Sequence, residues 1–226
     1  MVSVDKIYII NLEHSVDRKL RTTDQLRCAN VSNYEFFKGI IPDIGVLQTF
    51  PNFCKGQPEQ TKLNILGCLL SHIAIMKLAI ERGHDNIIVL EDDCRILDND
   101  FVAKVNACLS ENEFSNHYDI LYLGANHKRR AIEKLNDHLY RTNNGANGTF
   151  AYCVSRPFME ELVRPSNYKF PIDVHWKKFR TGRTNKFYCL IPHVVNICDC
   201  ISVIHDAQTN YEKQILDSQK RLISGF

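Results

Sequence analysis

Three consecutive carboxylates, Glu91-Asp92-Asp93, directly follow the apolar run at 87–90. A short apolar run rich in β-branched residues predicts a strand that is buried on both faces, as in a parallel sheet. Ligands of such sheets bind just beyond the carboxyl ends of the strands, so acids at this point suit a divalent cation and the phosphates that it carries. Because side chains alternate along a strand, we expect Glu91 and Asp93 on one side and Asp92 on the other. The alternative is a solvated turn after a strand.

Asn11, Leu12 and Arg18 come at the end of another apolar run and just after it, where a Rossmann-like half domain would place a nucleotide. Amide groups can hydrogen-bond to a uracil, and an arginine can meet a phosphate with two parallel hydrogen bonds. The alternative is a strand end followed by a solvated helix arginine. No glycine-rich phosphate loop follows this run, which disfavours dinucleotide cofactors and P-loop chemistry.

A long apolar stretch carries several residues at helical spacing. Gly67 and Ser71 are four residues apart, so they would share one stripe of a helix and let a strand or a ligand approach closely. His72 is either a pocket residue or a core histidine satisfied by the backbone. Cys68 and His72 are also four residues apart, but two residues do not make a metal site.

Two later segments combine polar residues with features of a ligand site. Asn147-Gly148-Thr149 is a candidate loop that could close over a sugar, with a simple hairpin turn as the alternative. Asp173 precedes Trp176, and a carboxylate beside an aromatic plate suits the hydroxyl groups and the face of a sugar. The alternative for Asp173 is the N-cap of a helix at 174–179.

The elements that must position these residues alternate along the chain. The sequence predicts strands at 6–11, 34–38, 87–90, 119–123 and 150–154, and helices at about 16–28, 63–82, 99–109, 157–163 and 209–226. A loop is expected at 41–59 and a mobile excursion at 127–147. Strands that alternate with helices predict an α/β fold with a mostly parallel sheet flanked by helices. The last helix is amphipathic, and it packs either on the domain or on a partner, which would make a homo-oligomer.

Composition predicts one soluble globular domain over residues 1–226. The 28 basic and 26 acidic residues leave a formal charge of +2, which disfavours a nucleic acid as partner. No apolar stretch reaches the roughly 18–20 residues of a membrane span, and the start lacks the order of a signal peptide. The nine cysteines are scattered without zinc-site spacing. We therefore expect mostly buried free thiols and a cytoplasmic, reducing location.

Several motifs occur in an order that resembles one family. They are Ile7-Tyr8-Ile9-Ile10-Asn11-Leu12 with Asp17-Arg18, Phe37-Lys38-Gly39-Ile40, Gly67-Cys68-Leu69-Leu70-Ser71-His72, Val89-Leu90-Glu91-Asp92-Asp93, Asp119-Ile120-Leu121-Tyr122-Leu123-Gly124, Gly148-Thr149-Phe150-Ala151-Tyr152 and Pro171-Ile172-Asp173. Over about 6–204 this set is similar to glycosyltransferase family 25, which includes lipooligosaccharide galactosyltransferases and procollagen galactosyltransferase domains. The resemblance implies a GT-A fold and a UDP-sugar donor, with galactose or glucose as the hexose.

The resemblance also implies a Mn²⁺ (or Mg²⁺) ion at the acids that resemble a DxD motif. Asp93 would be a direct ligand, Glu91 a ligand or a ribose contact, and His205 a late ligand that completes the shell. The donor would be bound by Asn11, Leu12, Arg18, Ser71, His72, Glu91, Asp92 and Thr149.

Inverting transfer would need a base that takes the proton of the acceptor. Asp173 is the candidate, with Asp199 and Asp206 behind it, and His72 is not assigned this role. The acceptor would be a glycan or a hydroxylysine-type residue of a protein. The alternative is a non-catalytic module that binds a nucleotide or a glycan on the same fold.

Overall fold

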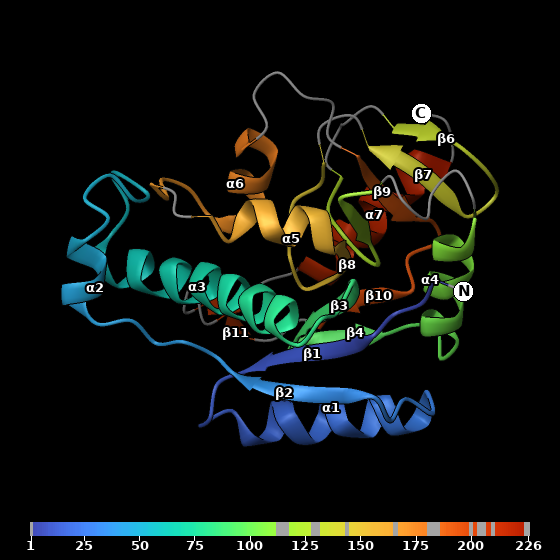
Figure 1. Cartoon of the computed structure of the whole chain (residues 1–226), viewed down its shortest axis with the longest axis horizontal. Coiled ribbons are helices and arrows are strands. Elements are labelled where there is room, and N and C mark those ends of the chain that lie inside the picture. Colours follow the sequence, from blue (N-terminus) through green and yellow to red (C-terminus); the bar gives the residue numbers. More distant parts are fainter. Residues whose placement is uncertain are drawn as a thin grey trace.

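The computed structural model describes residues 2–111, 118–127, 132–142, 145–164, 167–179, 186–198, 201–202, 207–208 and 211–223. Its strands are β1 (Lys6–Asn11), β2 (Tyr34–Lys38), β3 (Asn86–Glu91), β4 (Cys94–Ile96), β5 (Ile120–Tyr122), β6 (Ile132–Lys134), β7 (Leu139–Thr142), β8 (Ala151–Ser155), β9 (Phe187–Leu190), β10 (Val195–Ile197), β11 (Ile201–Ser202) and β12 (Ala207–Gln208). Its helices are α1 (Val16–Cys28), α2 (Ile44–Gln48), α3 (Glu59–Glu81), α4 (Phe101–Ser110), α5 (Arg156–Leu162), α6 (Ile172–Phe179) and α7 (Tyr211–Ile223) (Figure 1).

In the described part of the chain, eight strands form one sheet in the order β2-β1-β3-β8-β5-β9-β7-β6. β1 pairs in parallel with β2 and β3, and β5 pairs in parallel with β9. β8 runs antiparallel between β3 and β5, and β7 runs antiparallel to β9 and β6. Within this sheet all strands except β7 and β8 therefore point the same way, which confirms the predicted mostly parallel α/β sheet flanked by helices.

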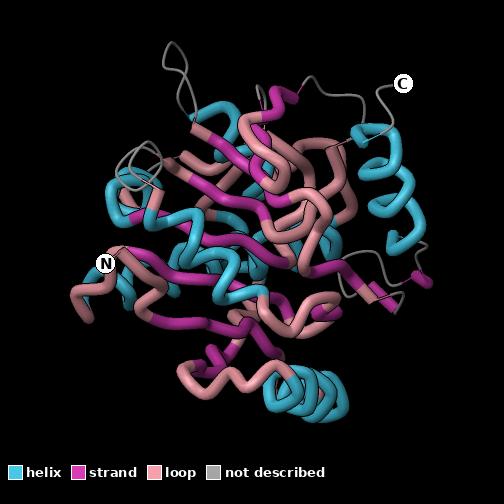
Figure 2. The backbone as a smooth tube through the Cα atoms, turned by 90° about the vertical axis from the view of Figure 1, so that its right-hand side faces the viewer, coloured by secondary structure: helices cyan, strands magenta, loops and turns pink. Residues whose placement is uncertain are grey.

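Helices cover both faces of the sheet, because the side chains of each central strand alternate between two cores. In β3, Ile87 and Val89 pack in one core with residues of α3, α5 and α6. Ile88 and Leu90 pack in the other core with residues of α1, α4 and α7. Figure 2 shows the helices on either side of the stacked strands. A strand buried on both faces explains why β3 reads as a continuous apolar run.

The structure corrects two expectations about connecting segments. The predicted loop at 41–59 contains α2, whose N-cap Asp43 accepts a hydrogen bond from the backbone N–H of Val46. The predicted excursion at 127–147 contains β6 and β7, which join the edge of the sheet. Strands at a sheet edge often carry charged side chains and resemble loops in sequence. The charged residues of β6 and β7 therefore led to the prediction of a loop.

The described residues of the C-terminal helix α7 pack on the domain, which is the first of the two predicted alternatives. Ile215 is buried in the core that contains α1 and α4. Glu212 forms an ion pair with Arg95 of β4 at 2.8 Å, and the side chain of Gln219 accepts a hydrogen bond from the backbone N–H of His193. α7 thereby lies against β10.

Two predictions about the whole chain concern membranes and cysteines. Among the described helices, α3 alone has the length and composition to cross a membrane, and 50% of its most apolar window is buried inside the protein. A helix buried in a core meets the same criterion, and α3 packs on the sheet. The described cysteines are free thiols, as predicted, and Cys94, Cys108, Cys153 and Cys189 are buried.

Candidate active site

Two of the three carboxylates at the end of β3, Glu91 and Asp92, separate as the alternation predicts. Glu91 follows Val89 on the face covered by α3, and its Oε1 lies 3.4 Å from Nε2 of His72. Asp92 follows Leu90 on the other face and turns toward Arg18 of α1. Because adjacent residues of a strand point to opposite faces, the Glu91 and Asp92 side chains meet different helices.

Asp92 connects the acidic turn, which is the Glu91-Asp92-Asp93 segment at the end of β3, to β1 and α1. Its carboxylate accepts a hydrogen bond from Nδ2 of Asn11 at 2.7 Å and another from Arg18 at 2.9 Å. Its backbone oxygen accepts a hydrogen bond from the hydroxyl of Thr22 at 3.2 Å. Asn11 also donates to the backbone oxygen of Ser15 at 3.1 Å. The structure therefore brings together three residues that the sequence predicted for donor binding, and in it they contact one another.

Glu91 lies at the centre of a second set of contacts. The hydroxyl of Thr149 donates to Oε1 of Glu91 at 2.7 Å. Burial alone would raise the pKa of Glu91, but the contact with His72, the hydrogen bond from Thr149 and the charge of Arg18 lower it below its ordinary value. This carboxylate is therefore held in its ionised form.

Asp93 has few partners for a carboxylate whose side chain is only 15% exposed. Its Oδ1 has no hydrogen-bond partner among the described residues, and Oδ2 lies 3.8 Å from the guanidinium of Arg18. Burial, together with the charge of Glu91, raises the pKa of Asp93 to about 7. The Oδ1 atom of Asp93 therefore offers a coordination position to a cation.

These groups border one cleft of about 760 Å³. A volume of several hundred cubic ångströms is in the range of small-molecule sites. The predicted residues that line it are Leu12, Arg18, Ser71, His72, Glu91, Asp92, Asp93, Thr149 and Asp173. Asn11 is buried, at 6% exposure, and is not among the lining residues. The cleft lies past the carboxyl ends of β1 and β3, where parallel sheets bind ligands.

Gly67 and Ser71 of α3 shape one wall of the cleft, as their spacing predicted. A Cβ atom at Gly67 would lie 2.5 Å from the backbone oxygen of Ile40, so only glycine allows this approach. The Ser71 hydroxyl donates to the backbone oxygen of Gly67 at 2.7 Å and accepts from the backbone N–H of Ile40 at 2.8 Å. Ser71 thus holds the segment after β2 against α3.

Asp173 lies in the first turn of α6, which begins at Ile172, so it is not the N-cap of a helix at 174–179. Its Oδ1 accepts a hydrogen bond from the backbone N–H of Val174 at 2.8 Å, and its Oδ2 accepts one from Gly148 at 3.4 Å. The ammonium of Lys177 lies 3.9 Å from Oδ2. Asp173 therefore faces the loop that carries Thr149.

The prediction that Trp176 offers an aromatic surface for a sugar beside Asp173 is wrong. Trp176 is 0% exposed, and its ring packs against that of Tyr152 at 4.9 Å between centroids. The reason is tertiary packing: the Trp176 ring lies against the rings of Tyr152 and His72 in the core between α6 and the sheet. Trp176 therefore offers no face for a sugar to stack on.

Sequence reasoning missed several residues of the cleft and placed others where the structure gives no description. His14, Tyr211 and Gln214 line the cleft, and the two α7 residues could not be assigned to it without the path of the chain. Cys68 also lines the cleft, next to Glu91 in space but not in sequence. His205, Asp199 and Asp206 lie outside the described residues.

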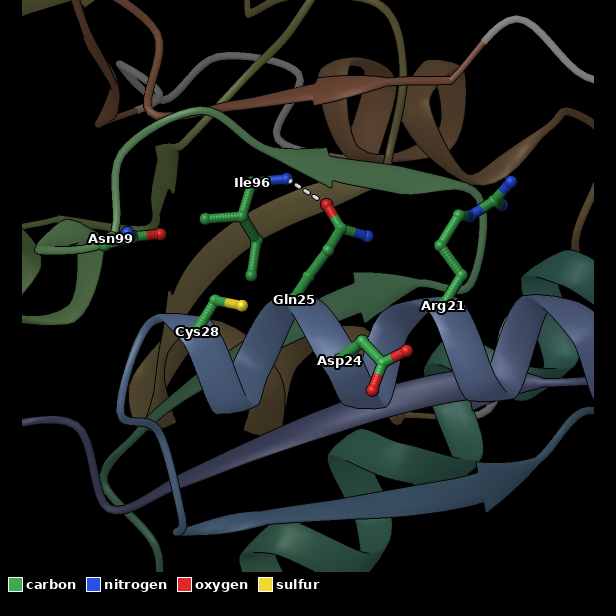
Figure 3. Close-up of a pocket in the computed structure, with 6 residues that line it drawn as sticks. All are labelled: Arg21, Asp24, Gln25, Cys28, Ile96 and Asn99. Carbon is green, nitrogen blue, oxygen red and sulfur yellow. Dashed lines mark hydrogen bonds between the residues drawn. The ribbon is translucent and has the colours of Figure 1, made fainter.

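A second hollow, of about 510 Å³, lies between α1 and the segment that contains β4 (Figure 3). Its lining residues are Arg21, Asp24, Gln25, Cys28, Ile96 and Asn99. Gln25 donates to the backbone oxygen of Cys94 at 3.1 Å and accepts from the backbone N–H of Ile96 at 2.8 Å. These bonds tie β4 to α1, so we assign Gln25 a structural role.

Comparisons with known proteins agree with the motifs. Residues 4–176 match the family described as glycosyltransferase family 25 (LPS biosynthesis protein). A Haemophilus influenzae protein named as a candidate glycosyltransferase is 24% identical over 207 residues, which are 84% of this chain and 71% of that protein.

Solved structures with a similar course of the chain include UDP-glucose pyrophosphorylase complexed with UDP-glucose. It has a TM-score of 0.47 and 8% identity, and the match covers 99% of this chain and 100% of that chain. A glycosyltransferase involved in glycosylation of the major capsid of PBCV-1 has a TM-score of 0.37 and 10% identity, with 78% and 68% covered. These scores are too low to bear on activity. The family match, by contrast, spans the chain from β1 into α6, and the chain therefore belongs to glycosyltransferase family 25 and is a glycosyltransferase.

Proposed function

We propose that the chain transfers a hexose, galactose or glucose, from a UDP-sugar to a hydroxyl group of a glycan or of a hydroxylysine-type protein acceptor. The observation that carries this proposal is the placement of Glu91, Asp93 and Asp173 around one cleft of about 760 Å³. Metal ligation and proton abstraction both use carboxylates. Here the carboxylates for the metal come from the end of β3, and the carboxylate for the proton comes from α6.

A Mn²⁺ or Mg²⁺ ion fits the acids at the end of β3. Both ions prefer hard oxygen ligands, and Oδ1 of Asp93 is a buried oxygen with no hydrogen-bond partner among the described residues. We assign Asp93 as a direct ligand and Glu91 as a ligand or a ribose contact, with His205 as the proposed late ligand. Such an ion stabilises the charge of a diphosphate as it leaves.

The nucleotide would lie beyond β1, beside Leu12 and Arg18. Both residues line the cleft, and Arg18 reaches the acidic turn through Asp92. A guanidinium has five N–H donors, so Arg18 can donate hydrogen bonds to the carboxylates and to a diphosphate at the same time. Asn11 and Asp92 would then act on the donor through the position of Arg18.

Asp173 is our proposed base in an inverting displacement. The oxygen of the acceptor hydroxyl would attack the anomeric carbon while Asp173 takes its proton, and the bond to the nucleoside diphosphate would break on the opposite face. The backbone N–H groups of Val174 and Gly148 hold the Asp173 carboxylate at the cleft. Asp199 and Asp206 are the other candidates for this role.

The experiment is a screen of UDP release across UDP-sugars, with a sugar acceptor present and with and without Mn²⁺. We expect release from UDP-galactose or UDP-glucose that requires Mn²⁺, and an inverted anomeric configuration in the product. Asp173→Asn should lower the rate by about 10²- to 10⁴-fold, the usual contribution of a general base, and leave UDP affinity unchanged.

Other outcomes would assign different roles. UDP binding without release from any donor would indicate a non-catalytic binding module. Loss of UDP binding in Asp173→Asn would make Asp173 a donor-site residue, and full turnover would move the base elsewhere. A product with retained configuration would remove the need for this base.

A further inference from the structure

Cys68, His72 and Glu91 line the cleft and bring three different ligand atoms together. Cys68 and His72 are one turn apart on α3, and β3 brings Glu91 opposite to them. The Sγ atom, an imidazole nitrogen and a carboxylate oxygen all lie within 4.8 Å of one another. All three residues line the cleft. His72 is 0% exposed, whereas Cys68 and Glu91 are partly exposed, so an ion would enter past these two side chains.

His72 is oriented as a ligand would be. Its Nδ1 lies 2.8 Å from the hydroxyl of Tyr152, in a buried hydrogen bond. Its Nε2 is buried and has no hydrogen-bond partner among the described residues, while Oε1 of Glu91 lies 3.4 Å away. Histidines that bind metals commonly hydrogen-bond through the other ring nitrogen, which fixes the ring. Tyr152 provides that bond here.

The charge around Cys68 also favours a cation. The carboxylates of Glu91 and Asp173 both act electrostatically on the Cys68 thiol. Negative charge attracts a divalent ion, and a bound ion stabilises the thiolate form of the cysteine that ligates it.

We propose that Cys68, His72 and Glu91 form a site for Zn²⁺. Thiolate, imidazole and carboxylate are the ligands that Zn²⁺ combines, and three protein ligands leave one position open to water or substrate. Mn²⁺ and Mg²⁺ favour hard oxygen ligands over thiolate, so the Cys68 thiolate separates this site from the one assigned to Asp93. Bonds of about 2.0–2.3 Å require the three atoms to move closer by small side-chain rotations.

Glu91 would be shared between the two sites, and this has a consequence for activity that depends on the proposed function. Zn²⁺ bound here would draw the Glu91 carboxylate away from Thr149 and from a Mn²⁺ ion held by Asp93. Zn²⁺ should therefore inhibit the Mn²⁺-dependent transfer, and less so in a variant that lacks the thiol.

The test is a titration of the metal-free protein with Co²⁺, followed by displacement with Zn²⁺ in competition with a chromophoric chelator. A thiolate bound to Co²⁺ gives a charge-transfer absorption, which reports Cys68 directly. Cys68→Ser should lose this absorption and bind Zn²⁺ at least about 100-fold more weakly, whereas Cys54→Ser, a half-buried cysteine in the same chain, should behave as wild type. Tyr152→Phe keeps all three ligands and should weaken Zn²⁺ by about 10- to 100-fold, the usual effect of losing an outer hydrogen bond.

The proposal fails if wild type shows no thiolate absorption, or if Cys68→Ser keeps the absorption and the affinity. If Cys68→Ser does not fold, His72→Gln replaces it, and unchanged Zn²⁺ affinity in that variant overturns the site. The titration uses neither a UDP-sugar nor turnover, so its failure is distinct from a failure of the proposed transfer.

Discussion

Replacing Asp92 by Asn should destabilise the fold much more than its surface-like sequence context suggests. The two oxygens of Asp92 accept from Asn11 at 2.7 Å and from Arg18 at 2.9 Å. An amide has one oxygen, so in Asp92→Asn one of these donors would face an NH₂ group. A buried donor left without an acceptor costs about 1–3 kcal/mol, and a hydrogen bond to a charged group contributes about 1.5–3 kcal/mol. Because Arg18 remains partly exposed, we discount the ionic part and expect a loss of about 2–4 kcal/mol.

Urea unfolding followed by circular dichroism measures this loss. With a slope of about 2–3 kcal/mol per molar for a chain of this size, the midpoint should fall by about 1 M. The matched control is Asp24→Asn, because Asp24 pairs with Arg27 on the exposed side of α1, where both side chains are more than half exposed. That pair should contribute less than about 1 kcal/mol. Equal midpoints for the two variants would refute the view that Asp92 fastens the acidic turn.

Three further predictions follow from local geometry. Gly67→Ala should lower stability by about 1–3 kcal/mol, as overpacking does, because its Cβ would lie 2.5 Å from a backbone oxygen; thermal unfolding measures it, and unchanged stability would contradict the close approach. Burial, with the charge of His127, lowers the pKa of His193 to about 3, below the unfolded value of about 6.5. The contribution of His193 to stability is therefore complete above about pH 6.5 and falls as the pH drops toward 3. Between pH 7.5 and 5 the free energy of unfolding of His193→Gln should fall by about 2 kcal/mol less than that of the exposed-site control His138→Gln. Equal decreases in the two variants would exclude a lowered pKa of His193. Arg18→Ala should weaken UDP binding by about 1.5–3 kcal/mol, and an unchanged calorimetric affinity would move the phosphate site elsewhere.

The central part of the fold could be predicted from the sequence because its elements have strong periodic signals. β1, α1 and β2 begin and end at the predicted residues, and α3 was missed only in its first turn. The short strands β4, β9 and β10 were not predicted. Three or four residues carry little periodicity, and their pairing depends on contacts across the chain, such as Ile197 of β10 with Cys94 of β4.

The site was predictable as a set of residues but not as a set of contacts. Alternation along β3 separated Glu91 from Asp92 correctly, because that rule is local. No local rule shows that Asn11 donates to Asp92, or that Cys68 lies beside Glu91. Those contacts come from the parallel pairing of β1 with β3 and from the packing of α3 on the sheet.

The central claim is that the acids after β3 bind a metal ion that is needed for transfer, and Asp93→Asn tests it most directly. UDP affinity measured by calorimetry with and without Mn²⁺ should increase with the metal in wild type and not in Asp93→Asn, which should also show no transfer. Asp98→Asn is the matched control, because Asp98 forms an ion pair with Lys104 a few residues further along the chain, and it should keep both properties. Transfer at the wild-type rate by Asp93→Asn, with Mn²⁺ still increasing its UDP affinity, would contradict the account.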